Sequence, residues 1–243
     1  MEPILNYYLN VLPIYFLEVL AIITGFYFLF KRKTNNWNKG LVYFLMFTVF
    51  TELIASYAIV GFFSDYNYFS FVEDTLFKKN TWIYNCFLLL EFIFFILYFR
   101  YYIKSHYWKN NIKIAVIVFV ITSILNLLLT DVFFRSYSQI TIIFGTLLLL
   151  ITVFRFYFEL LNSDDVLNIK RYLPLYISIG ILIFYLCFSP LSIYSNYYKI
   201  ANKLFMKVFS NGLLFANLFK YLIFSLGFLV CSKKKKNNNE LNE

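Results

Sequence analysis

Residues 80–100 have the sequence NTWIYNCFLLLEFIFFILYFR. Between Asn80 and Arg100 the only formally charged residue is Glu91. A helix rises 1.5 Å per residue, so about 20 predominantly apolar residues cross the hydrocarbon core of a bilayer. The run does not alternate between polar and apolar residues, as a strand of an outer-membrane barrel would. Because lipid offers the backbone no hydrogen-bond partner, we predict that residues 81–99 form a transmembrane helix.

Two similar apolar runs precede this segment and four follow it. They cover residues 11–30, 41–62, 114–130, 140–160, 173–194 and 209–230. None of the polar segments between them is long enough for a soluble domain. The sequence therefore predicts an all-α, polytopic membrane protein with seven transmembrane helices. We expect this membrane domain to occupy residues 1–231, followed by a disordered tail, rich in Lys and Asn, at 232–243.

The composition supports a membrane protein and excludes other classes. Hydrophobic residues make up 61% of the 243 residues and charged residues 14%, against about 45–50% and about 25% in soluble domains. Intrinsic disorder has the opposite composition, and three scattered cysteines do not form a disulfide framework. The net charge of +9 does not indicate nucleic-acid binding, because Lys and Arg lie between the apolar runs.

The distribution of Lys and Arg predicts the orientation. With the N-terminus outside, segments 31–40, 100–113, 161–172 and the tail are cytoplasmic, and together they carry 14 Lys and Arg. The outer segments then carry six. Because cytoplasmic loops of membrane proteins are enriched in Lys and Arg, we predict an outside N-terminus and a cytoplasmic C-terminus.

Three ionisable residues, Glu52, Glu91 and Lys220, fall near the middle of their predicted spans. An intramembrane charge costs about 2.5–3.5 kcal/mol and is a functional-site hypothesis by default. Lys220 lies ten residues, about 15 Å, from the inner end of its span, too far for its stem to reach water. We expect the three to face the interior, pair with each other or change protonation. Since two carboxylates face one ammonium, we expect Glu52 or Glu91 to be protonated or to hold a cation.

Glu18 and Arg155 lie closer to the ends of their spans. Glu18 is in the outer half of its span, where tilt or a crevice would give it access to water. Arg155 is five residues from the inner end, and Glu159 follows it at i+4 on the same helix face. We predict a local Arg155–Glu159 ion pair at the cytoplasmic edge.

Polar neighbours extend the midplane group. Asn217 precedes Lys220 by three residues, and Asn85 lies beside the helix face that contains Glu91. These asparagines and Glu18, like the three midplane charges, either hold helices together through interhelical hydrogen bonds or form a site for a ligand, an ion or a proton. The sequence leaves both interpretations open.

The sequence offers no catalytic set. One His and three distant Cys do not supply the ligands of a zinc site, and the P-loop, GxSxG and HExxH patterns are absent from the sequence. We therefore expect no catalytic residues, no metal site and no cofactor, and enzyme activity is disfavoured.

Two blocks carry a resemblance to known proteins. NTWIYNCFLLLEFIFF (80–95) and RYLPLYISIGILIFYL (171–186) resemble segments of small, uncharacterised seven-helix inner-membrane proteins of bacteroidetes-type bacteria. This resemblance implies the topology and carries no activity.

The depths of Lys220 and Glu91 also resemble those of the retinal lysine and its counterion in microbial rhodopsins and heliorhodopsins. That resemblance implies a retinal-binding Lys220. The sequence departs from it because the sixth span has no Trp and no Asp lies near Lys220.

The leading functional prediction is a sensor, signalling or accessory subunit of the cell inner membrane. It would bind a small or lipophilic ligand in the helix bundle and contact a membrane or cytoplasmic protein partner. The alternatives are a small proton- or cation-coupled transporter or channel, a membrane scaffold or defence-type effector, and a retinal-binding protein. We also expect the lipid bilayer to be a partner, and we expect no nucleic-acid partner.

Overall fold

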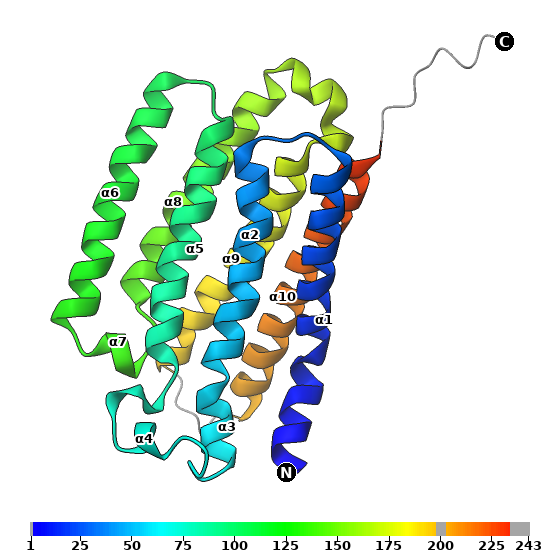
Figure 1. Ribbon diagram of the computed structural model, residues 1–243. Helices are drawn as coiled ribbons and strands as arrows, with labels where there is room; N and C mark the ends of the chain where they lie inside the picture. Colours follow the sequence, from blue (N-terminus) through cyan, green and yellow to red (C-terminus); the bar gives the residue numbers. More distant parts are fainter. Residues whose placement is uncertain (1, 198–202, 234–243) are drawn as a thin grey trace.

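The computed structural model describes residues 2–197 and 203–233, which form helices joined by loops, without a strand (Figure 1). Within these described residues, seven helical segments are long and apolar enough to cross a membrane. Their helices are α1 (Glu2–Lys31), α2 (Asn36–Ala55) with α3 (Tyr57–Phe63), α5 (Thr81–Tyr102), α6 (His106–Leu129), α8 (Gln139–Leu161), α9 (Leu173–Tyr197) and α10 (Lys203–Ser232). The chain is thus all-helical, and its seven apolar helices suggest an integral membrane protein.

Short helices occupy the connections. They are α4 (Ser70–Glu73), η1 (Leu76–Lys78), α7 (Val132–Arg135) and η2 (Asp164–Arg171). The predicted second span, 41–62, falls within residues 36–63, which are long and apolar enough to cross a membrane, and the helix within it is interrupted at Ser56. Apart from residues 232 and 233, the tail that we expected to be disordered lies outside the described residues.

The helices pack as a bundle in which α5 and α10 are central. Helix α10 packs along both α9 and α1, and α5 contacts α2, α6 and α8. Among the seven segments, α5 has the largest buried share. Helix α6 lies at one edge of the bundle and α1 at the other (Figure 1). Residues of α5 and α10 therefore meet in the interior.

Aromatic rings pack directly against glycines of neighbouring helices. A Cβ added at Gly145 of α8 would lie 2.5 Å from the ring of Phe92 of α5. A Cβ at Gly180 of α9 would lie 2.8 Å from the ring of Phe224 of α10. Both rings are fully buried. These contacts fix how closely α8 approaches α5 and α9 approaches α10.

The bundle has two chemically different ends. The α1–α2 connection, the α5–α6 connection and η2 lie at one end, with the end of α10 (Figure 1). The segments 31–40, 100–113 and 161–172, which carry ten Lys and Arg, include these connections, so we call this end the basic end. Helices α3, α4 and α7 lie at the opposite end, with the N-terminus (Figure 1).

Candidate functional site

An ion pair joins α5 to α10 inside the bundle. Lys220 Nζ lies 3.6 Å from Glu91 Oε1, and the two residues are 4% and 5% exposed. The ammonium also lies 4.0 Å from the ring centroid of Phe184 and 4.6 Å from that of Tyr221. Lys220 is therefore enclosed by a carboxylate and two aromatic faces, which suit a cation that has left water.

Two more carboxylates complete a charged cluster, which we define as Glu18, Glu52, Glu91 and Lys220. Glu52 of α2 is half-buried. Glu18 of α1 is 2% exposed and lies beside the Glu52 carboxyl group and the Tyr221 hydroxyl group. Neither carboxyl oxygen of Glu18 makes a hydrogen bond with any described residue. The cluster therefore places three carboxylates around one ammonium.

The burial of Glu18 corrects the expectation that tilt or a crevice would give it access to water. Helix α1 packs along α10, and Glu18 lies on the face that meets Tyr221 and Lys220 of that helix. The depth of Glu18 in its span follows from its position in the sequence, but its rotation about the helix axis does not. Rotation brings Glu18 into the charged cluster.

A cavity of about 150 Å³ lies next to the charged cluster. Glu52, Glu91, Lys220 and Asn217 contribute its polar groups, and Glu18 is not among its lining residues. The remaining wall is mainly aromatic and apolar. It is formed by Thr48, Tyr84, Phe87, Leu88, Tyr137, Phe184, Phe188, Leu213 and Tyr221. An apolar cavity of this size holds a benzene-sized molecule, and a polar one holds a few waters.

The charge of the cluster is not balanced by its own residues. With all four groups ionised, three carboxylates and one ammonium carry a net charge of −2. Buried charge of one sign is costly unless a proton, a cation or hydrogen bonds offset it. Within residues 2–197 and 203–233, no three His, Cys, Asp or Glu side chains are arranged to hold a metal ion.

The two predicted asparagines have different roles. Asn85 is 1% exposed; its amide lies 3.4, 3.1 and 3.0 Å from the carbonyl oxygens of Val132, Phe133 and Ser136. Its Oδ1 accepts from the Ser138 N–H at 3.0 Å. Asn85 therefore fastens the α7 connection to α5 and does not line the cavity. Asn217 lines it and donates to the Leu213 carbonyl oxygen within α10 at 3.0 Å.

Sequence reasoning missed Tyr185 and Tyr221. Both are almost completely buried, and Tyr185 lies beside Glu91 as Tyr221 lies beside Glu18. The chain has 22 Tyr, so residue type alone did not distinguish these two. Their hydroxyl groups place hydrogen-bonding capacity next to the carboxylates of the cluster.

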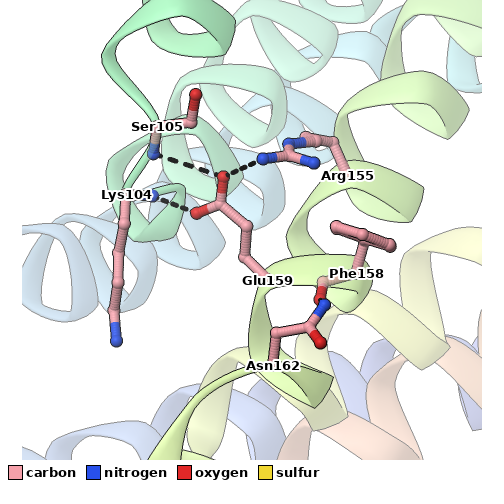
Figure 2. A network of polar contacts seen from close by, with 6 residues as sticks. All are labelled: Lys104, Ser105, Arg155, Phe158, Glu159 and Asn162. Atoms are coloured by element: carbon pink, nitrogen blue, oxygen red, sulfur yellow. Dashed lines mark hydrogen bonds and ion pairs between the residues drawn. The ribbon is translucent and has the colours of Figure 1, made fainter.

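A second polar network lies near the basic end, between α8 and the start of α6 (Figure 2). The predicted Arg155–Glu159 ion pair is confirmed at 2.7 Å. Glu159 also accepts from the backbone N–H groups of Lys104 and Ser105, the latter at 3.2 Å, and the Arg155 guanidinium lies 5.2 Å from the ring centroid of Trp108. This carboxylate satisfies backbone donors next to a helix N-terminus, so the network ties α6 to α8.

Comparison of the chain with protein-family models, with curated proteins and with solved structures found no match. The two resemblances seen in the sequence therefore stay predictions.

Proposed function

We propose that this protein binds a small organic cation in the cavity beside Glu52 and acts as a sensor or accessory subunit of the cell inner membrane. The observation that carries the proposal is a small cavity among apolar helices whose lining contains two carboxyl groups, Glu52 and Glu91, and one ammonium group, Lys220. Such a wall favours a ligand with a positive charge and an apolar body.

The lining of the cavity supports this ligand class in two ways. Glu52 and Glu91 can accept hydrogen bonds from an ammonium group, while Lys220 offsets only one carboxylate of the cluster. The rings of Phe87, Phe184 and Tyr84 surround the same space, and aromatic faces attract cations. The volume limits the apolar body to about the size of a benzene ring.

A sensing role is supported by the number of helices that a ligand would touch. The lining residues come from α2, α5, α9 and α10 and from Tyr137 just before α8. A ligand that fits one arrangement of these helices better than another shifts the population between them. The short connections at the basic end would pass that shift to a protein partner.

Binding is tested with benzylammonium as the probe and the purified full chain in detergent. We expect the probe to raise the thermal unfolding midpoint in a concentration-dependent way, since binding to the folded state alone stabilises it. The increase should be lost in Glu52→Gln and kept in Glu73→Gln, an exposed carboxylate on α4. No increase in the wild type, or an equal increase in Glu52→Gln, would overturn the proposal.

Proton- or cation-coupled transport is the second candidate. It is favoured because the carboxyl groups of Glu18 and Glu52 lie side by side. Adjacent carboxyl groups can pass a proton between them. Transport predicts ion or proton flux into liposomes that Glu91→Gln abolishes.

A scaffold or a defence-type effector is the third candidate. Conservative replacements of Glu52, Glu91 and Lys220 that change only the stability of the protein would favour it.

Retinal binding receives little support from the cavity. Its volume of about 150 Å³ suits a single ring, and retinal carries a long polyene chain in addition. Visible absorption after addition of retinal, lost in Lys220→Ala, would be needed to sustain this alternative.

The orientation with an outside N-terminus is tested by cysteine labelling. In a chain with its three cysteines replaced by Ser, Asp74→Cys lies between α4 and η1 and His106→Cys begins α6 at the basic end. Both positions are exposed. A membrane-impermeant maleimide should label Asp74→Cys in intact spheroplasts and His106→Cys only after permeabilisation. The reverse pattern would contradict the proposed orientation.

A further inference from the structure

The basic end contains a second polar pocket that is unrelated to the charged cluster. Its volume is about 260 Å³, and Arg32, Lys33 and Arg171 line it together with Asn35 and Tyr102. No Asp or Glu is among its lining residues. Arg32 and Lys33 come from the α1–α2 connection, and Arg171 ends η2. We call this site the basic pocket.

A shallow depression of about 520 Å³ adjoins the basic pocket and shares Arg32 and Lys33 with it. It adds the side chains of Lys31 and Lys39, and again no carboxylate lines it. Five cationic side chains therefore surround two connected spaces. Like charges gathered this closely repel each other unless an anion lies between them.

Hydrogen bonds fix the loop that carries these cations. Asn35 Oδ1 accepts from the Asn38 backbone N–H at 2.9 Å and caps α2. Asn38 Oδ1 accepts from the hydroxyl groups of Tyr98 and Tyr102 at 2.9 and 2.8 Å, and Asn38 Nδ2 donates to Thr34 Oγ1 at 2.7 Å. The loop is thus anchored to α5, so little backbone freedom is left to lose when an anion binds.

Apolar side chains lie directly beside the cations. Leu29 and Phe30 line the depression, and Phe30 is 88% exposed at the end of α1, a helix apolar enough to span a membrane. This apolar surface contributes nothing to the binding of a soluble anion, whereas a lipid acyl chain can lie along it. Guanidinium and ammonium groups suit the phosphate that the same lipid carries.

We propose that the basic pocket binds the phosphate group of an anionic phospholipid, with an acyl chain lying along Phe30. Basic pockets between transmembrane helices are recognised sites for anionic headgroups. The proposal does not rest on the proposed function, because the two sites share no residue.

The test uses the purified full chain in detergent and native mass spectrometry of bound lipid. Phosphatidylglycerol, phosphatidylcholine and inorganic phosphate are the three probes. Wild-type protein should retain phosphatidylglycerol in preference to phosphatidylcholine. Arg32→Gln/Arg171→Gln should bind phosphatidylglycerol about 30-fold more weakly, because each basic group near an anionic lipid contributes a factor of about five.

Lys109→Gln/Lys113→Gln is the matched control, since it removes two positive charges from α6 at the same end of the bundle. We expect it to bind phosphatidylglycerol within about twofold of the wild type, because Lys109 and Lys113 do not line the basic pocket. An equal loss in both double variants would assign the effect to general surface charge and overturn the proposal.

Two further arms keep the test decisive. Inorganic phosphate that binds as tightly as phosphatidylglycerol would overturn the lipid as the source of the phosphate. If Arg32→Gln/Arg171→Gln does not fold, Lys33→Gln replaces it, because Lys33 also lines the basic pocket and its side chain is exposed. Unchanged phosphatidylglycerol binding in that variant would equally overturn the proposal.

Discussion

Replacing Lys220 with Met should destabilise the protein more than replacing Glu91 with Gln. The Lys220 Nζ–Glu91 Oε1 distance is 3.6 Å, which corresponds to roughly 4–5 kcal/mol of attraction at an effective dielectric constant of about 20. Lys220→Met leaves Glu18, Glu52 and Glu91 without their cation, so we expect a loss of about 3–5 kcal/mol, typical of a broken buried pair. Glu91→Gln leaves Lys220 within the field of the other two carboxylates, so the loss should be roughly half as large.

A double-mutant cycle measures the coupling. Free energies of unfolding come from SDS titration of the detergent-solubilised protein, followed by tryptophan fluorescence. The double variant Glu91→Gln/Lys220→Met removes both charges, so it should be less destabilised than the sum of the singles by about 1–3 kcal/mol. Lys207→Met is the control, because Lys207 lies on the same helix and is exposed. It should change stability by less than about 0.5 kcal/mol.

The pattern of the variants distinguishes lost charge balance from lost packing. Lost charge balance predicts that the two single variants differ and that the double variant is less destabilised than their sum. Equal destabilisation by both single variants and additivity within about 0.5 kcal/mol would refute the electrostatic account. Lys220 would then contribute only through the packing of its stem.

Three further predictions address contacts elsewhere in the bundle. Gly145→Val should lower stability by about 1–3 kcal/mol in the same titration, because its Cβ would lie 2.5 Å from the buried Phe92 ring; wild-type stability would contradict the close contact. Asn85→Ala should cost about 2–4 kcal/mol and speed hydrogen exchange in residues 132–138, whose backbone it binds. Glu159→Gln should lower stability by about 1–3 kcal/mol and speed exchange at the start of α6, because it removes the charge that faces the guanidinium and the backbone donors in Figure 2; unchanged exchange would show that this carboxylate does not hold the helix terminus.

Run length and charge position predicted much of the fold. Seven apolar runs gave seven helices, since the bilayer thickness constrains helix length strongly. Depth in the span also predicted that Glu91 and Lys220 cannot stay alone at the midplane, and they form an ion pair. Both inferences use distance along one helix, which the sequence specifies directly.

Contacts between helices were harder to predict. Asn38 lay outside the predicted second span, 41–62, so nothing connected it with Tyr98 and Tyr102 on another helix, yet it accepts a hydrogen bond from both. Glu159 was expected to pair with Arg155 but not to accept from the α5–α6 connection. Such contacts depend on how each helix is rotated about its axis and which helices lie next to each other. The sequences of weakly amphipathic, lipid-facing helices indicate little about this rotation and pairing.

Asn85 and Glu18 show how helix-pairing residues differ from a functional site. Both are at most 2% exposed. Asn85 uses its donors and its acceptor on the α7 connection, so its burial is explained by the packing that it holds in place. Neither carboxyl oxygen of Glu18 makes a hydrogen bond with a described residue, although an unsatisfied buried polar group costs about 1–3 kcal/mol and a charged one more. Helix pairing accounts for Asn85, whereas at Glu18 the neighbouring groups that could offset this cost are the Tyr221 hydroxyl and the Glu52 carboxyl group. A proton shared with Glu52, or a cation held next to it, would offset the cost. The side of the cluster formed by Glu18 and Glu52 is therefore where a ligand or a proton has most to contribute.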